Sequence, residues 1–357
     1  MIEVVHDIDR IAAEWDELVD RAGGGPFDRP GWYAAWWDAF GDEGRMGAIT
    51  LRAGGRLCAA VPLVRSGGMS WSPTNEHTPR FDLIGEDEDA LAELARIVLR
   101  LRQKRLTAFP IPAEGAGLAA LRGAIEEAGY RSVERTVLRS PYIDLTGLEE
   151  AAGLLDRKMR KEMRRVRRRL EEEGTLVLDV VRDAEGVPAA LEEAYALEAL
   201  QWKGEAGSAI ASDEGTRAFY SAVATWAAAR GTLRLAMLRL DGRAIAFELD
   251  ILDGGGLHAM KAGFDPEWSR FSPGHLLMLD LIDEAIAQGV RTYEFLGDAE
   301  PYKLRWTEDV REMRRLEASP PGARGAIDHA RTAYVARAVR GVRRRLPRRS
   351  GGGAPGR

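Results

Sequence analysis

A pattern that occurs twice constrains the fold of this chain more than any other feature. Residues 47–66 (GAITLRAGGRLCAAVPLVRS) and residues 235–252 (LAMLRLDGRAIAFELDIL) each contain two strand-forming runs separated by a glycine turn, which is the pattern of a β-hairpin. The shared positions are Leu51, Arg52, Gly55, Arg56 and Ala59 in the first segment and Leu238, Arg239, Gly242, Arg243 and Ala246 in the second. We therefore predict an internal duplication, in which each half forms a mixed α/β unit.

The length and composition of the chain suit a soluble protein with two such units. The sequence has 357 residues, of which 45% are hydrophobic and 30% are charged, and its formal net charge is −5. Cys58 is the single cysteine, so a disulfide within the chain and a cysteine-rich zinc site are excluded, and no metal is predicted. The first residues (MIEVVHDIDRIAAEW) are unlike a secretory signal, and no apolar run approaches the roughly 20 residues of a membrane helix. These features predict a cytoplasmic protein without a transmembrane segment.

A basic segment between the two halves marks the boundary of the predicted units. Ser140-Pro141 and Gly147 bracket a short strand, and a long helix with apolar residues at a 3–4 spacing follows it. The C-terminal residues are rich in arginine and then in glycine, which predicts partial disorder. The predicted organisation is residues 1–150 for the N-terminal unit, 151–174 for the basic linker helix, 175–318 for the C-terminal unit and 319–357 for the basic tail.

Residues 265–289 (DPEWSRFSPGHLLMLDLIDEAIAQG) predict an amphipathic helix whose first turn suits an anion. Ser272 fits the N-cap position and Pro273 fits the first helical position. Gly274 removes the Cβ that would keep a ligand away from the backbone, and Arg270 adds a positive charge just upstream. Because the N-terminus of a helix has free N–H groups and a partial positive charge, it can bind a phosphate. The alternative interpretation is an ordinary capped helix without a ligand.

The order of elements around this turn resembles the core of the Gcn5-related N-acetyltransferase (GNAT) superfamily. A predicted strand (LHAMKAG) precedes the turn, and the helix leads into a second strand (RTYEFLG). In that superfamily the first strand binds the pantetheine arm of the cofactor, and the helix start binds its pyrophosphate. Ser-Pro stands here where the superfamily pattern has glycines. The resemblance implies that the cofactor is acetyl-CoA or another acyl-CoA and that it contacts Arg270, Phe271, Ser272, Pro273, Gly274 and His275.

A set of short motifs along the chain is similar to one branch of this superfamily. The motifs GWYAAWWDAFG, SPYIDL, LEALQWKGEAGSAI, SRFSPGHLL and FLGDAEPYKLRWT occur in this order. Together they resemble the bacterial acetyltransferase-like proteins of cellulose and exopolysaccharide biosynthesis, which are relatives of the Fem peptidyltransferases. The implied fold is a tandem of duplicated GNAT-like units, each a mixed, mostly antiparallel sheet flanked by helices. The implied reaction is acyl transfer to an amine or hydroxyl of a small molecule, sugar or cell-envelope precursor, in a cleft between the units.

The duplication raises the question of which unit binds the cofactor. The helix of the first half that corresponds to the Ser-Pro-Gly helix opens with Asp87, Glu88 and Asp89. Carboxylates at this position are favourable for the helix dipole but would repel a pyrophosphate. We therefore predict that only the second unit binds acyl-CoA.

Aminolysis of a thioester requires a base, donors for the oxyanion and an acid for the leaving thiolate. The resemblance implies that Tyr302 is this acid and that Lys303, in a Tyr-Lys pair as in the Fem relatives, is also functional; the alternative is a surface loop. The candidates for the base are Glu248, Asp265 and His258. An ordinary core histidine and a carboxylate that only orders its loop are the alternatives for the last two.

Candidate acceptor contacts lie at the end of a predicted helix. Glu198 and Trp202 share one face of this helix, and Lys203 follows them. The resemblance makes these residues, together with His258, candidates for acceptor binding. Alternatively, Lys203 only complements the C-terminus of the helix.

Nine basic residues fall within residues 157–169, namely Arg157, Lys158, Arg160, Lys161, Arg164, Arg165, Arg167, Arg168 and Arg169. A partly paired, solvated linker helix is one interpretation. RNA or another anionic partner is the second, and would favour a Fem-like transferase that uses aminoacyl-tRNA. A third function, from a different class, is an inactive scaffold in polysaccharide assembly. The arginine-rich tail also allows peripheral binding at the inner membrane face.

Overall fold

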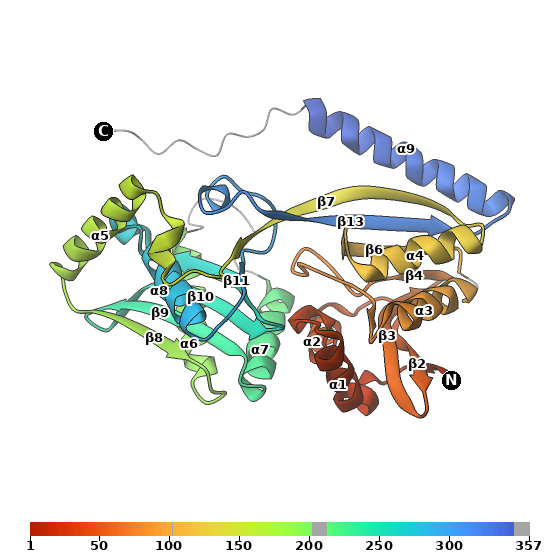
Figure 1. The fold of residues 1–357 in the computed structure, drawn as a ribbon, viewed down its shortest axis with the longest axis horizontal. Helices are drawn as coiled ribbons and strands as arrows, with labels where there is room; N and C mark the ends of the chain where they lie inside the picture. The colour runs from red at the N-terminus through yellow and green to blue at the C-terminus, as the bar shows by residue number, and fades with distance from the viewer. Residues whose placement is uncertain (102, 202–212, 346–357) are drawn as a thin grey trace.

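The computed structural model describes residues 1–101, 103–201 and 213–345, and it contains two lobes that lie side by side (Figure 1). The first lobe is built from β1 (Ile2–Val5), α1 (Ala12–Ala22), α2 (Pro30–Phe40), β2 (Arg45–Ala53), β3 (Arg56–Ser66), β4 (Met69–Trp71), β5 (Ile84–Gly85), α3 (Glu88–Arg100), β6 (Arg105–Pro112), α4 (Ala116–Glu127) and β7 (Arg131–Asp144). The remaining elements are α5 (Arg157–Glu171), β8 (Leu176–Val181), α6 (Val187–Gln201), α7 (Glu214–Ala229), β9 (Leu233–Leu240), β10 (Arg243–Asp253), β11 (Gly256–Phe264), α8 (Pro273–Ala287), β12 (Thr292–Glu294), β13 (Val310–Ser319) and α9 (Ala323–Arg345).

The two glycine-turn hairpins confirm the predicted duplication down to individual contacts. The β2–β3 pairing shifts register just after Leu51, and the β9–β10 pairing shifts at the equivalent position next to Leu238. Arg52 donates to the carbonyl oxygen of Gly55 and to Glu14 of α1, at 3.0 Å in each case. Arg239 makes the same two kinds of contact, with the carbonyl oxygen of Gly242 at 3.3 Å and with Glu193 of α6 at 2.7 Å.

The strand order repeats in the same way. The first half of the sheet runs β1-β2-β3-β4-β6-β13, and the second half, read from the other edge, runs β8-β9-β10-β11-β12-β7. In each half a single parallel pair, β4 with β6 or β11 with β12, interrupts otherwise antiparallel pairing. The helices lie against this sheet (Figure 1). The structure therefore consists of tandem GNAT-like units, each a mixed, mostly antiparallel sheet flanked by helices.

The last strand of each unit is exchanged with the other unit. β13 comes from the end of the second unit and inserts between β6 and β7 of the first. In return, the final residues of β7, Tyr142–Asp144, pair with β12 of the second unit. In Figure 1 both strands run from between the lobes across the right-hand lobe, beneath α9. Because two ladders cross the boundary, the relative position of the units is fixed by backbone hydrogen bonds as well as by side chains.

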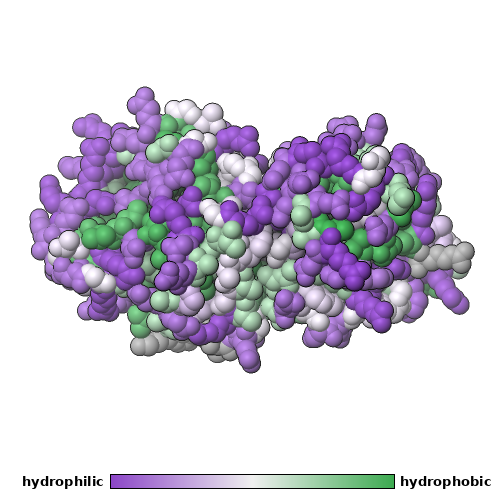
Figure 2. Space-filling model, turned by 90° about the horizontal axis from the view of Figure 1, so that it is seen from below, coloured by the Kyte–Doolittle hydropathy of each residue, from purple (hydrophilic) through white to green (hydrophobic). Residues whose placement is uncertain are grey.

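Side chains add two further connections between the units. Trp32 of α2 packs edge-on against Phe219 of α7, with ring centroids 5.1 Å apart. Arg29, whose side chain is 4% exposed, donates to Asp16 and Asp20 of the first unit and to Asp253 of the second. Figure 2 shows the resulting shape, two lobes joined at a narrower waist under a mostly hydrophilic surface.

The two basic segments are both helical. The carboxylate of Asp156 caps α5 by accepting from the N–H of Met159 at 2.7 Å, and Met163, Val166 and Leu170 are buried beneath the helix. The basic tail that the sequence predicts from residue 319 begins with the 23-residue helix α9, and residues 346–357 lie outside the described residues. No helix in the described residues is long and apolar enough to cross a membrane.

Candidate active site

The second unit contains an opening between two parallel strands. β11 and β12 pair only over Gly256–His258 and Thr292–Glu294. Beyond this point β11 continues to Phe264, bonded on its other side to β10, whereas the chain after β12 turns away and the N–H of Phe295 donates to the carbonyl oxygen of Pro141 at 3.1 Å. One edge of the second half of β11 is therefore left facing a gap.

A cavity of about 690 Å³ fills this gap, and we call it the apolar cavity. Its walls include all residues from Ala259 to Phe264, together with Gly274, His275, Met278, Tyr293, Phe295, Leu296, Gly297, Tyr302, Lys303 and Trp306. Most of these side chains are apolar or aromatic, so the cavity can bury an elongated apolar group, while the free edge of β11 can hydrogen-bond to amides within that group.

The start of α8 lies at this cavity, and its capping differs from the one that the sequence predicted. Ser272 occupies the N-cap position with a left-handed φ of 48°, and its side chain makes no capping hydrogen bond. Gly274 lines the cavity, and a Cβ added there would meet only a Phe264 ring atom at 3.7 Å. Pro273 has no N–H, and within the described residues no acceptor is found for the Gly274 N–H. The helix start thus presents bare backbone to the cavity.

The other predicted residues of this turn do not all face the cavity. Phe271 is buried, and His275 packs its ring edge-on against Trp306, at 5.3 Å. Arg270 is on the surface, where it pairs with Glu173 at 3.1 Å. The pKa of His275 is lowered, first by burial and then by the charge of Arg305, the residue that precedes Trp306 in the chain.

Glu248 is a buried carboxyl at the floor of the apolar cavity. It is 3% exposed and accepts a hydrogen bond from the hydroxyl of Tyr293 on β12. Burial raises the pKa of Glu248 to about 7, and the Tyr293 hydrogen bond opposes this shift. Asp250, two residues along the same strand, is completely buried, and burial raises its pKa as well. A carboxyl that titrates near neutral pH in a cavity is suited to accept a proton.

Tyr302 and Lys303 also belong to this cavity, but they differ in their surroundings. Tyr302 is half exposed, and its pKa is raised by burial of the phenol and by the carboxylate of Glu300. Lys303 is 6% exposed. Its ammonium donates to the carbonyl oxygens of Leu296 and Asp298, at 2.8 and 3.3 Å, and pairs with Glu300 at 3.0 Å. Lys303 therefore holds the loop that follows β12.

The remaining predicted residues are spread over three places. Glu198 lines the apolar cavity and lies 3.5 Å from the ammonium of Lys261. Asp265 caps the short helix Pro266–Phe271 by accepting from the N–H of Glu267, and it pairs with Arg243. His258 lines a different cavity, described below. Trp202 and Lys203 lie outside the described residues.

The first unit contributes side chains to the apolar cavity that sequence reasoning missed. Residues Glu76–Pro79 of a long loop line the cavity. The ring of His77 contacts the hydroxyl groups of Thr216 and Tyr220 of α7, at 3.2 and 3.4 Å. Burial lowers the pKa of His77. The motif TNEHTPRF carries no local pattern that would indicate this position.

In the first unit the equivalent opening is closed. After the parallel pairing of β4 with β6, the hydroxyl of Ser72 donates to the carbonyl oxygen of Phe109 and accepts from its N–H, at 2.9 and 3.1 Å. The N–H of Ala90 at the start of α3 is also occupied, because the carboxylate of Asp87 accepts from it at 2.7 Å.

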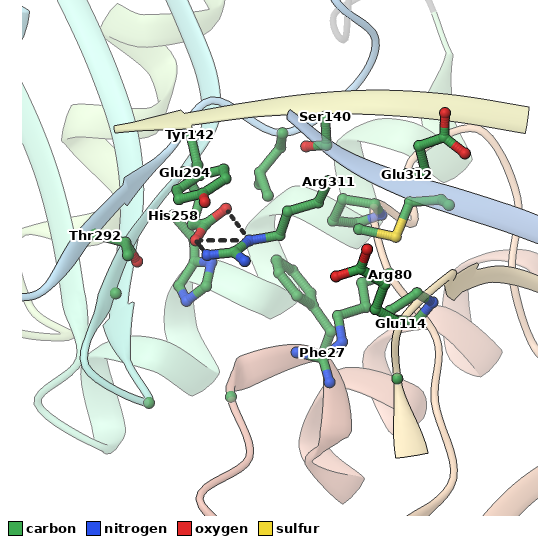
Figure 3. A pocket seen from close by; sticks show the side chains of 18 of the residues that line it. Phe27, Arg80, Glu114, Ser140, Tyr142, His258, Thr292, Glu294, Arg311 and Glu312 are labelled. Carbon is green, nitrogen blue, oxygen red and sulfur yellow. Dashed lines mark hydrogen bonds and ion pairs between the residues drawn. The ribbon is translucent and has the colours of Figure 1, made fainter. Parts of the chain in front are cut away.

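A second cavity of about 1060 Å³, the polar cavity, lies between the units (Figure 3). Phe27, Arg80 and Glu114 reach it from the first unit, and His258, Thr292 and Glu294 reach it from the second (Figure 3).

Ion pairs and aromatic contacts form the walls of the polar cavity. Glu294 pairs with Arg311 at 3.0 Å, and the Arg311 guanidinium lies over the ring of Tyr142 at 3.8 Å. The ring of His258 meets Phe27 edge-on at 5.3 Å. Burial is the main reason why the pKa of His258 is lowered, so the imidazole is neutral at neutral pH.

The fold and the opening between β11 and β12 together define a tandem GNAT-like protein in which the second unit has the open site. Comparison with known proteins agrees, since residues 157–304 match the acetyltransferase (GNAT) domain family. No curated protein matches the chain by sequence.

Solved structures match over almost the whole chain. The structure of FemX superposes with a TM-score of 0.59 at 12% identity, covering 88% of this chain and 96% of FemX. L-PGS from Bacillus licheniformis gives a TM-score of 0.55 at 12% identity, covering 91% and 96%. A conserved protein of unknown function from Bacteroides thetaiotaomicron gives 0.56 at 12% identity, covering 90% and 100%. At these identities the likeness is one of fold.

Proposed function

We propose that this protein transfers an acetyl or other acyl group from acyl-CoA to an amine or hydroxyl group. The observation that carries the proposal is the opening between β11 and β12, which has a free strand edge on one side, the bare helix start at Gly274 at one end and the buried carboxyl of Glu248 at its floor. The match of residues 157–304 to an acetyltransferase domain family supports acyl transfer as the general reaction.

The donor would lie along the apolar cavity. The edge of β11 from Ala259 to Phe264 can hydrogen-bond to the amides of the pantetheine arm, and the N–H of Gly274 can donate to the pyrophosphate. Arg305 precedes Trp306, whose ring packs against His275, and is a cation that can approach this phosphate, whereas Arg270 pairs with Glu173. In the first unit, Ser72 and Asp87 occupy the equivalent positions with their own hydrogen bonds, which supports one donor site per chain.

The chemistry follows from the groups in this cavity. The nitrogen or oxygen of the acceptor attacks the thioester carbonyl carbon while Glu248 accepts its proton, because a carboxyl with a pKa near 7 can exist as the base at neutral pH. Free N–H groups on β11 can stabilise the oxyanion. As the carbon–sulfur bond breaks, Tyr302 donates its proton to the thiolate. Its raised pKa keeps it protonated beforehand.

The acceptor class is proposed from resemblance and from the cleft between the units. The motifs quoted above support a sugar, small molecule or cell-envelope precursor, and a role in cellulose or exopolysaccharide biosynthesis. A solved structure of the same fold is FemX.

A second candidate donor is aminoacyl-tRNA, and one observation favours it. Arg157, Lys158, Lys161, Arg164 and Arg168 of α5 are exposed, and within the described residues they make no ion pairs. A surface of this kind can bind a polyanion. If α5 binds RNA and the apolar cavity binds no CoA, the donor is a charged tRNA; if neither binds, the scaffold function remains.

The test is thiol release from acetyl-CoA in the presence of a panel of amines, comparing the wild type with Tyr302→Phe. We expect turnover by the wild type and a loss of at least about 100-fold in kcat in the variant, the usual contribution of a general acid. Equal rates would remove Tyr302 from the mechanism. In parallel, binding of bulk tRNA at increasing salt, with Arg164 and Arg168 changed to Gln as the matched variant, tests the alternative donor.

A further inference from the structure

We propose that the polar cavity binds the acceptor and that the acceptor reaches the acyl group between Pro79 and Leu296. This inference rests on the proposed function, because it takes the apolar cavity as the donor site. It assigns the acceptor as a hydrophilic, hydroxyl-bearing amine and excludes a lipid.

The two cavities share a short stretch of wall. Pro79 of the first unit and Leu296 of the second line both of them. The cavities therefore approach each other across these two side chains and are otherwise lined by different residues. A group entering the polar cavity from solvent can meet a thioester in the apolar cavity only at this partition.

The turn at Leu296 holds one side of this partition in place. Leu296 has a φ of 55°, a conformation that residues with a Cβ adopt rarely, and Gly297 follows with a φ of 61°. The buried ammonium of Lys303 donates to the Leu296 carbonyl oxygen at 2.8 Å and fixes this turn. The conformation turns the chain away from β11, so the gap between the strands stays open next to the partition. Strained backbone of this kind is typical of functional sites.

The lining of the polar cavity contains more charged residues than the lining of the apolar cavity. The apolar cavity combines aliphatic and aromatic residues, against which a donor arm can pack, with the charged residues Glu76, Glu198, Glu248, Lys261, Glu300 and Lys303. The polar cavity presents Arg80, Glu114, Asp144, Arg291, Glu294 and Arg311 among its charged residues. An alkyl chain placed among these charges would gain little apolar contact and would leave them poorly solvated.

Several groups in the polar cavity have hydrogen-bonding capacity to spare. His258 donates from Nε2 to the carbonyl oxygen of Asp253 at 3.2 Å, while its buried Nδ1 has no partner among the described residues. The buried Nε of Arg80 also lacks a partner there, and its Nη2 is 3.5 Å or more from Asp82 and Asp28. Glu114 is exposed and makes no ion pair within the described part of the chain. The exposed carboxylate of Glu114 can pair with an ammonium group that enters the cavity, whereas the buried Nδ1 of His258 and Nε of Arg80 become available to a ligand only when these side chains move.

Cysteine accessibility tests the route without knowledge of the natural acceptor. Cys58 is the single cysteine and is buried, so the wild type measures background reaction. Three variants are modified with a small water-soluble thiosulfonate: Leu296→Cys at the partition, Ala262→Cys in the apolar cavity and Thr292→Cys in the polar cavity. We expect saturating CoA to slow modification of Ala262→Cys at least tenfold and to change that of Leu296→Cys and Thr292→Cys by less than twofold. Equal protection of Leu296→Cys and Ala262→Cys by CoA, or no reaction at Leu296→Cys, would overturn the route.

Competition by amines tests the acceptor class in the same variants. Glucosamine at millimolar concentration should slow modification of Thr292→Cys several-fold, and octylamine at the same concentration should not. Protection by octylamine alone, or by neither amine, would overturn the assignment of a hydrophilic acceptor. If CoA fails to protect Ala262→Cys, the proposed donor site is wrong, and the glucosamine result still decides whether the polar cavity binds such amines.

Discussion

The substitution Glu248→Gln should change how the stability of the protein depends on pH. Glu248 has an ordinary pKa of 4.5, and burial raises it to about 7 in the folded protein. The folded state therefore holds this proton more tightly than the unfolded chain does. The stabilisation is complete below pH 4.5 and is lost as the pH rises through 7.

The size of the change in the free energy of unfolding follows from the shift in the pKa of Glu248. A change from 4.5 to about 7 corresponds to about 3 kcal/mol in the free energy of unfolding. Glutamine mimics the protonated carboxyl but does not titrate. We therefore expect the free energy of unfolding of the wild type to fall relative to that of Glu248→Gln by up to about 3 kcal/mol between pH 5 and pH 8. Most of this decrease should occur below pH 7.

Urea unfolding of both proteins at pH 5, 6, 7 and 8 measures this difference directly. Tyr293→Phe provides the matched control, because it removes the hydrogen bond that lowers the pKa of Glu248 and should move the loss of stability to higher pH. A difference between wild type and Glu248→Gln that is the same at all four pH values would refute the argument that this carboxyl is buried and neutral, and with it the assignment of Glu248 as the base.

Two further substitutions test how the site is held together. Arg29→Met leaves Asp16, Asp20 and Asp253 without their shared cation and should lower the free energy of unfolding, measured with urea, by about 3–5 kcal/mol. Arg10→Met is the control, because Arg10 forms a surface pair at 3.1 Å and its loss should lower the same free energy by less than about 1 kcal/mol. Equal costs would contradict the cross-unit role of Arg29. Lys303→Met should lower stability by about 2–3 kcal/mol, because it removes charge-assisted hydrogen bonds to two carbonyl oxygens. A loss of kcat without a loss of stability would instead assign Lys303 to the substrate.

The sequence predicted the parts of the fold and site that depend on local pattern. The two hairpins were recognisable because glycine turns and flanking strands leave a signal within 20 residues. The helix start was recognisable because proline at the first helical position is a local signal, although Ser272 does not cap the helix as expected. Gly274 lies at the apolar cavity.

Contacts between distant segments were not predictable in this way. The exchange of β7 and β13 depends on pairing between Arg131–Pro141 and Val310–Ser319, and no residue in either strand indicates its partner. His77 reaches the apolar cavity from a loop of the other unit. Arg270 and Lys303 have long side chains whose partners depend on the tertiary structure, and both bond to groups, Glu173 and the Leu296 carbonyl, that the sequence did not indicate.

Calorimetric titration with acetyl-CoA, comparing the wild type with Gly274→Val, tests the central claim most directly. A Cβ at Gly274 would make only an ordinary contact, with a Phe264 ring atom at 3.7 Å, and under the proposal a valine side chain would take the space that the phosphate needs. We therefore expect a folded variant, verified by its unchanged circular dichroism and melting temperature, that binds acetyl-CoA at least tenfold more weakly than a micromolar wild type. Absence of binding to the wild type, or equal affinity in the two proteins, would contradict the assignment of the apolar cavity as the acyl-CoA site.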